Sequence, residues 1–191
     1  MFVARTHHRF SLADYEQMVD LGILTENDRV ELIRGEIIEK MSIGEFHAAC
    51  VRKLTRLFTS RLGDRASVSV QNPVVMSDSE PEPDVTLLVP REDEYAASHP
   101  GPDDIVLVVE VSDASLAFDR HVKGSIYAEN GVAEFWILNL LDRTLEVHRQ
   151  PQPGGQYADV RILAASDVVD LAKLSGVTFT IGELFPPVTE S

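Results

Sequence analysis

The strongest constraint on the fold is an apolar run at positions 105–111 that a single carboxylate, Glu110, interrupts. The run, IVLVVEV, is short and rich in β-branched residues, which is typical of a strand covered on both faces. Alternation places Val106, Val108 and Glu110 on one face, and the other apolar residues on the opposite face: Ile105, Leu107, Val109 and Val111. Burial of an isolated carboxylate costs several kcal/mol or more, so we expect Glu110 to be paired, protonated or bound to a metal ion.

The remaining patterns predict an α/β (α+β) fold with a mixed sheet flanked by helices. We expect helices at 11–22, 45–62 and 117–130, and a hairpin that turns at Arg34-Gly35. The predicted strands are ASVSVQ, PVVM, DVTLLV, DIVLVVEVS, EFWILNL, TLEVHRQ and, at the outside of the sheet, YADVRIL. The 191 residues suit a single domain over 1–191, with its core at about 10–187.

Composition narrows the location and the partners of the protein. The chain has no apolar stretch long enough to span a bilayer and no secretory signal, so we expect it to be cytoplasmic. Its one cysteine, Cys50, rules out a disulfide within the chain and a multi-cysteine metal site, and we expect it to be buried.

The net charge of −14 does not favour a tight, indiscriminate DNA binder. Residues 66–191 carry the whole net negative charge, since residues 1–65 hold ten basic and ten acidic residues. Nucleic-acid contacts should therefore favour the N-terminal part. The helix expected at 45–62 has a basic face, which is either a solvated surface or a phosphate-binding surface: Arg52, Lys53, Arg56 and Arg61.

A second carboxylate, Asp84, follows Pro83 and opens the apolar run VTLLV. A proline in this place suits the start of a strand, where a side chain can reach a cleft. If Asp84 and Glu110 meet there, they repel each other, and a divalent cation would relieve the repulsion. The alternative is that Glu110 pairs with an arginine and that Asp84 caps a turn. The two residues by themselves leave both interpretations open.

Lys123 is spaced four residues from both Asp119 and Tyr127 on the helix that follows the Glu110 strand. It lies beside the apolar face of that helix and could bind a phosphate or orient a water molecule. A surface ion pair with Asp119 is the alternative. Glu31, in VELIRG, alternates with Val30 and Leu32, and a hairpin strand with one wet face explains it equally well.

Taken in order, several segments resemble the Uma-two family of restriction endonucleases in the PD-(D/E)XK nuclease superfamily. The resemblance runs from about Phe10 to Pro187 and rests on VELIRGEII, a helix that begins near His47, EPDV, VVEVSD, DRHVKGSIYAENGVAEFWIL and a closing Leu-Phe-Pro. Each segment is weak alone, but the combination is specific. The resemblance implies a mixed sheet flanked by helices.

The same resemblance implies an active site. Asp84 and Glu110 would bind the metal, Mg²⁺ or Mn²⁺, and the carbonyl of Val111 could add an oxygen ligand. Lys123 would be the catalytic lysine, and Glu31 the upstream acidic residue.

The chain departs from the superfamily signature at one position. The usual lysine lies two residues after the glutamate, where this chain has Ser112. Lys123 would be the same group displaced to the next helix. His47 matches a recurrent family position, where it could serve the site, pack against its helix or cap it.

The leading hypothesis is metal-dependent hydrolysis of DNA phosphodiester bonds, in which Lys123 orients the attacking water or stabilises the developing charge. A non-catalytic protein-interaction module on the same fold is one alternative, and hydrolysis of another phosphorylated substrate is a second. We also expect a homodimer, because a sheet of this kind has edge strands and because the segment around Trp136 is apolar.

Overall fold

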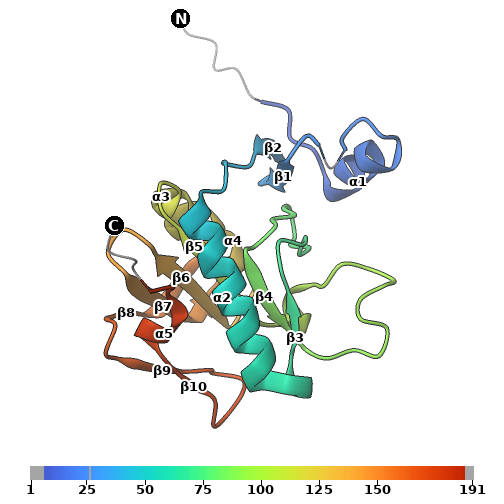
Figure 1. The fold of residues 1–191 in the computed structure, drawn as a ribbon. Coiled ribbons are helices and arrows are strands. Elements are labelled where there is room, and N and C mark those ends of the chain that lie inside the picture. Colours follow the sequence, from blue (N-terminus) through green and yellow to red (C-terminus); the bar gives the residue numbers. More distant parts are fainter. Residues whose placement is uncertain (1–6, 26, 188–191) are drawn as a thin grey trace, which may run out of the picture.

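The computed structural model describes residues 7–25 and 27–187, and it confirms the mixed sheet flanked by helices (Figure 1). The N-terminal elements are α1 (Leu12–Asp20), β1 (Val30–Ile33), β2 (Glu36–Glu39) and α2 (Glu45–Leu62). The central elements are β3 (Ser67–Ser69), β4 (Val85–Leu88), β5 (Ile105–Ser112), α3 (Leu116–Phe118) and α4 (Gly124–Glu129). The chain continues through β6 (Glu134–Asn139), β7 (Thr144–Gln152), β8 (Gln156–Leu163), β9 (Val168–Asp170), β10 (Thr178–Thr180) and α5 (Ile181–Leu184).

Six strands form the main sheet in the order β3-β4-β5-β6-β7-β8. Only β5 and β6 are parallel, and the chain between them forms α3 and α4. All other neighbours in this sheet are antiparallel, including β6 and β7, which join through the turn at 140–143. The sheet thus combines hairpins with one helical crossover, and β5 lies inside it with every residue buried.

Helices cover the sheet on both sides and create two apolar cores. On one face, α2 packs over β4, β5 and β6 together with the C-terminal segment that contains β9, β10 and α5 (Figure 1). On the other face, α4 covers Val108, Phe135 and Ile137. Cys50 is fully buried on α2, as expected, and Trp136 is fully buried in the first core. The apolar segment around Trp136 therefore offers no surface for self-association.

The N-terminal elements form a separate layer beside one end of the main sheet (Figure 1). Helix α1 lies within the range expected for the first helix, and Ser11 is its N-cap, with a side chain that accepts the amide of Asp14. The β1–β2 hairpin turns at Arg34 and Gly35, which both have positive φ, as a two-residue hairpin turn requires. Strand β1 also bridges to Glu80, so the hairpin is fastened to the loop that leads into β4.

Three details of the predicted elements are wrong. PVVM is not a strand: the amides of Val74 and Val75 bond to the carbonyls of Pro81 and Pro100, which lie in loops. A register shift between β4 and β5 pairs Leu88 with Ile105 and Leu87 with Leu107. This bulge exchanges the faces of the first two residues of the run, since Ile105 packs in the α4 core and Val106 in the α2 core.

The third detail concerns the helix expected at 117–130, which is interrupted by a π-helical turn at Asp119–Lys123. Among the described residues, no helix has the length and apolar character that a membrane crossing requires.

Candidate functional site

A cleft of about 900 Å³ opens where the hairpin layer faces one end of β4 and β5. Its walls come from β1, β2, the segment after β2, the first turn of α2 and the π-helical turn. The cleft contains every residue that the sequence analysis places in the active site, together with His47: Glu31, Asp84, Glu110, Val111 and Lys123. Segments more than ninety residues apart in the chain thus meet at one place.

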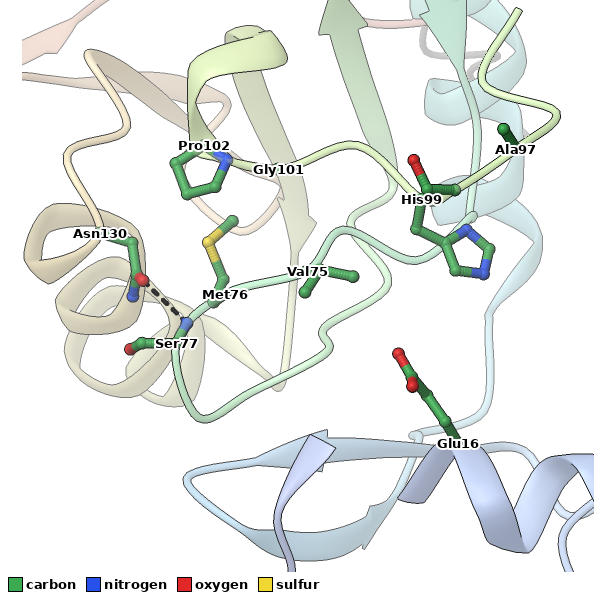
Figure 2. Close-up of a pocket in the computed structure, with 10 residues that line it drawn as sticks. Glu16, Val75, Met76, Ser77, Ala97, His99, Gly101, Pro102 and Asn130 are labelled. Atoms are coloured by element: carbon green, nitrogen blue, oxygen red, sulfur yellow. Dashed lines mark hydrogen bonds between the residues drawn. The ribbon is translucent and has the colours of Figure 1, made fainter. Parts of the chain in front are cut away.

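A second hollow, of about 610 Å³, lies on another part of the surface (Figure 2). Glu16 of α1 points into it from one side, and His99 and Met76 line the other. Asn130 accepts a hydrogen bond from the amide of Ser77 at its margin. Because Glu16 is the only carboxylate among its lining residues, this hollow lacks the paired acids of the cleft.

Asp84 lies directly before β4, at the strand end where the sequence places it. Its Oδ2 accepts the amide of Val111 on β5 at 2.9 Å and lies 3.0 Å from Nε2 of His47. Its Oδ1 accepts a weaker bond from Nε2 of Gln71 at 3.3 Å. These contacts cross between elements, so the alternative that Asp84 only caps a turn is wrong. They also hold the carboxylate in one orientation.

Glu110 is almost completely buried, and its partners are a lysine and a tyrosine rather than an arginine. Oε1 lies 3.2 Å from Nζ of Lys123 and accepts a 2.8 Å hydrogen bond from the hydroxyl of Tyr127. Burial raises the pKa of Glu110 well above its ordinary value, although the charge of Lys123 opposes the shift. A positive charge nearby therefore strongly stabilises the ionised form of Glu110.

Lys123 is buried, with 7% of its surface exposed, so the surface pair with Asp119 is wrong. Its Nζ lies 3.2 Å from Glu110 and 3.3 Å from Oε2 of Glu31. Burial by itself would lower the pKa of Lys123, but the charges of Glu110, Glu31 and Asp119 outweigh it and raise the pKa. The lysine therefore remains protonated and holds a fixed positive charge in the cleft.

The π-helical turn explains how a helix residue reaches this position. Residues spaced five apart are bonded in such a turn, which widens the helix and redirects the side chains that follow. Asp119, at its start, is also buried and accepts hydrogen bonds from Ser112 and Ser115 at 2.7 and 2.5 Å. Ser112 lies two residues after Glu110, and its hydrogen bond to Asp119 anchors the turn that carries Lys123.

Glu31 lies in the same buried cluster, and the alternative of a wet strand face is wrong. Its exposed fraction is 4%, and its Oε2 accepts the amide of Glu82 at 3.1 Å. The sequence could not decide this point, because the covering residues belong to the loop before β4. At the cleft margin, Lys40 forms an ion pair with Glu82.

His47 lies in the first turn of α2, and Nε2 faces Asp84. Burial would lower the pKa of His47, but the hydrogen bond to Asp84 and the charge of that carboxylate raise it overall. Its Nδ1 is buried and has no hydrogen-bond partner among the described residues. Of the roles left open by the sequence, the geometry favours a role in the site, where His47 orients Asp84.

Two hydrogen-bond partners of the acidic residues, Tyr127 for Glu110 and Gln71 for Asp84, gave little or no signal in the sequence. The sequence shows that Tyr127 shares a helix face with Lys123. This spacing places Tyr127 near the site, but it does not indicate a partner for its hydroxyl. Gln71 was not predicted as a site residue, because the sequence placed it at the end of the strand ASVSVQ. In the structure β3 ends at Ser69, and Gln71 lies in an irregular loop with a positive φ. Its contact with Asp84 arises only when the loop after β3 returns to the start of β4.

The donor set of the cleft suits a hard divalent cation. Asp84 and Glu110 provide carboxylate oxygens, and Mg²⁺ sites often use one or two carboxylates and complete the shell with water or substrate. The carbonyl of Val111 projects toward the same edge of β5 as its amide, which bonds to Asp84. Among the described residues, no three His, Cys, Asp or Glu side chains already form a metal-binding group. A cation would therefore be held by few protein ligands.

Comparisons with known proteins give a consistent result. A family model, Uma2, described as "Putative restriction endonuclease", matches residues 12–182. A crystal structure of "a putative nuclease belonging to DUF820" from Anabaena variabilis is similar in fold, with a TM-score of 0.68 and 16% identity. That match covers 92% of this chain and 97% of the other. No curated protein matches the sequence.

Proposed function

Since the chain belongs to the Uma2 family of restriction-endonuclease-like proteins, we propose that it is a metal-dependent endonuclease that hydrolyses DNA phosphodiester bonds. We further propose that the cleft is its active site, with Asp84, Glu110 and Val111 as metal ligands and Lys123 and Glu31 beside them. The metal would be Mg²⁺ or Mn²⁺, which prefer oxygen ligands.

The observation that carries the proposal is the buried cluster of Lys123, Glu110 and Glu31 next to Asp84. A structural ion pair needs one carboxylate for one lysine, but this lysine faces two at similar distances. The surplus negative charge is costly in a partly dehydrated cleft. It is explained if the carboxylates also serve a cation that arrives with the substrate.

The residues of the cleft have distinct roles in this mechanism. A divalent cation would polarise a phosphoryl oxygen and lower the pKa of a water molecule. Lys123 keeps its proton, so its ammonium can donate hydrogen bonds to a phosphate oxygen as negative charge develops there. Glu31 and Glu110 hold that ammonium in place before substrate arrives, and the hydrogen bonds from His47 and Val111 fix Asp84.

A polyanionic substrate needs a basic approach to this acidic cleft, and α2 provides one. Arg52 and Arg56 line a groove next to the cleft, with Ile43 and Gln71 shared between the two. Arg61, by contrast, makes a bidentate pair with Glu183. Of the two interpretations of the basic face, we therefore favour phosphate contact for its first half and a structural role for Arg61.

The test combines metal binding with plasmid cleavage. Isothermal titration of Mn²⁺ should show binding to the wild type, and Asp84→Asn should weaken it at least tenfold and abolish cleavage. Asp103→Asn is the matched control, because Asp103 is an exposed carboxylate in the turn before β5, at the far end of that strand from the cleft. Cleavage that is equally fast in Asp84→Asn and the wild type would refute the proposal.

A second experiment separates substrate binding from the metal site. Arg52→Glu combined with Arg56→Glu should weaken DNA binding and flatten its dependence on salt, while Mn²⁺ affinity stays unchanged. Arg65→Glu, beyond the end of α2, is the control. DNA affinity that does not change in the double variant would rule out α2 as the contact surface.

The observation that favours a non-catalytic module is the use of Ser112 as a partner of Asp119, since no lysine follows Glu110 directly. In that case the wild type would bind Mn²⁺ weakly or not at all and would leave plasmids intact under all metal conditions.

A further inference from the structure

The last strand of the main sheet, β8, has an unusual surface for an edge. It spans eight residues, Gln156–Leu163, and pairs with β7 on one side only. Figure 1 shows it at the margin of the sheet, opposite β3. Natural proteins shorten, charge or cover such edges, because unpaired backbone groups can join another strand. The opposite edge, β3, follows this rule, since it has only three residues.

The side chains of β8 do not protect it. Val160 and Ile162 are 50% and 67% exposed, and they lie on the same side of the strand. A lysine or proline is expected at such positions on an edge that must stay unpaired, but β8 has neither. The nearest charges, Asp159 and Arg161, have opposite signs and form an ion pair with each other.

The direction of the backbone groups follows from the register of the sheet. In a strand, the amide and the carbonyl of one residue project toward the same neighbour, and successive residues alternate. The carbonyl of Ser112 accepts the amide of Leu140, so Ser112 projects toward β6. Carried through the pairings of β6, β7 and β8, this alternation directs both backbone groups of Val160 and Ile162 away from β7.

We propose that a second copy of this chain docks on β8, antiparallel to it and centred on Val160. In that register the amide and carbonyl of Val160 exchange hydrogen bonds with the partner's Val160. Asp159 lies opposite the partner's Arg161, and Arg161 lies opposite the partner's Asp159. The same residues on both copies thus satisfy each other, as a two-fold interface requires.

The sequence of β8 selects this partner over an unrelated strand. Reversal of the strand about Val160 exchanges the positions of Asp159 and Arg161, so a copy presents opposite charges at each position. The exposed aliphatic side chains of Val160 and Ile162 gather on the other face, next to those of the partner. The pair would join two six-stranded sheets into one continuous sheet. Because β3 is short, the assembly closes as a dimer and does not extend into a fibre.

The test uses analytical ultracentrifugation of the full chain from low to high micromolar concentration. The wild type should form dimers in this range, since one strand pair buries less than the roughly 1,600 Å² typical of a stable complex. Asp159→Arg should weaken dimerisation about tenfold or more, because two attractive cross-strand pairs become repulsive. Arg161→Asp should do the same.

The double variant, Asp159→Arg with Arg161→Asp, restores opposite charges in the antiparallel register and should recover dimerisation. Leu141→Lys is the matched control, because Leu141 is 70% exposed in the turn between β6 and β7, away from the edge. Circular dichroism confirms that each variant is folded. A wild type that is monomeric throughout, or single variants that dimerise as the wild type does, would overturn the proposal, and so would a double variant that fails to dimerise while folded.

Discussion

Replacement of Lys123 by methionine tests whether the buried cluster is a charge-balanced unit. Methionine matches the length of the lysine stem, so the substitution removes the ammonium and leaves the packing nearly unchanged. In the folded protein, Glu110 and Glu31 then lose the cation that lies 3.2 and 3.3 Å away. Both are almost completely buried, so water cannot replace the lost partner without some opening of the cleft.

The magnitude follows from the distances. A unit charge pair at 3.2 Å interacts by about 5 kcal/mol at an effective dielectric constant of 20. Desolvation of both partners offsets part of this attraction, and measured losses from breaking buried pairs are about 3–5 kcal/mol. We therefore expect Lys123→Met to lower the free energy of unfolding by about 3–5 kcal/mol at pH 8. The loss should be smaller at pH 5.5, because a stranded carboxyl group with a raised pKa can take up a proton.

Urea denaturation at the two pH values measures this loss. Glu110→Gln combined with Lys123→Met removes one of the stranded charges, and it should recover part of the stability at pH 8. A loss below about 1 kcal/mol, or a loss that does not depend on pH, would refute the reasoning. Lys123 would then behave as a solvated surface lysine, contrary to its position in the structure.

Other buried or crowded positions give further expectations. Burial, with the charges of Glu16 and Glu82, raises the pKa of Glu80 to about 7, so the folded protein binds its proton more tightly than the unfolded chain. The stabilisation from protonated Glu80 is present below pH 4.5 and is lost as the pH rises toward 7. Glutamine stays neutral at every pH, so Glu80→Gln should stabilise the protein by about 1–3 kcal/mol at pH 8 and hardly at pH 4.5, as urea denaturation would measure. Arg149→Met should destabilise by about 3–5 kcal/mol, since the fully buried Glu134 loses its arginine; a melting temperature equal to that of the wild type would contradict this. Gly155→Ala should lower the melting temperature by several degrees, because φ is 72° and a Cβ would lie 2.4 Å from Oγ of Ser125; an unchanged melting curve would show that the turn can adjust.

The sequence predicted most of the regular elements because their signals are local. The predicted bounds of α2, Glu45–Leu62, agree with the structure, since apolar residues recur along this segment at helical spacing. The hairpin turn at Arg34-Gly35 and the outer position of β8 are confirmed as well. The strand predicted at PVVM was wrong because that prediction also rested on a local signal alone. A short apolar run does not reveal whether its backbone bonds to a strand or to a loop.

The sequence by itself determined that two carboxylates accompany buried strands, because Asp84 opens and Glu110 interrupts the apolar runs that fold into β4 and β5. Only the tertiary structure decided what they meet. A π-helical turn, fastened by Asp119, brings Lys123 to Glu110, and the separate hairpin layer adds Glu31. These contacts join residues far apart in the chain, and their strength depends on burial. The periodicity of the sequence shows which face of a helix or strand is apolar. The charge and packing of the elements that this face meets follow from the fold as a whole.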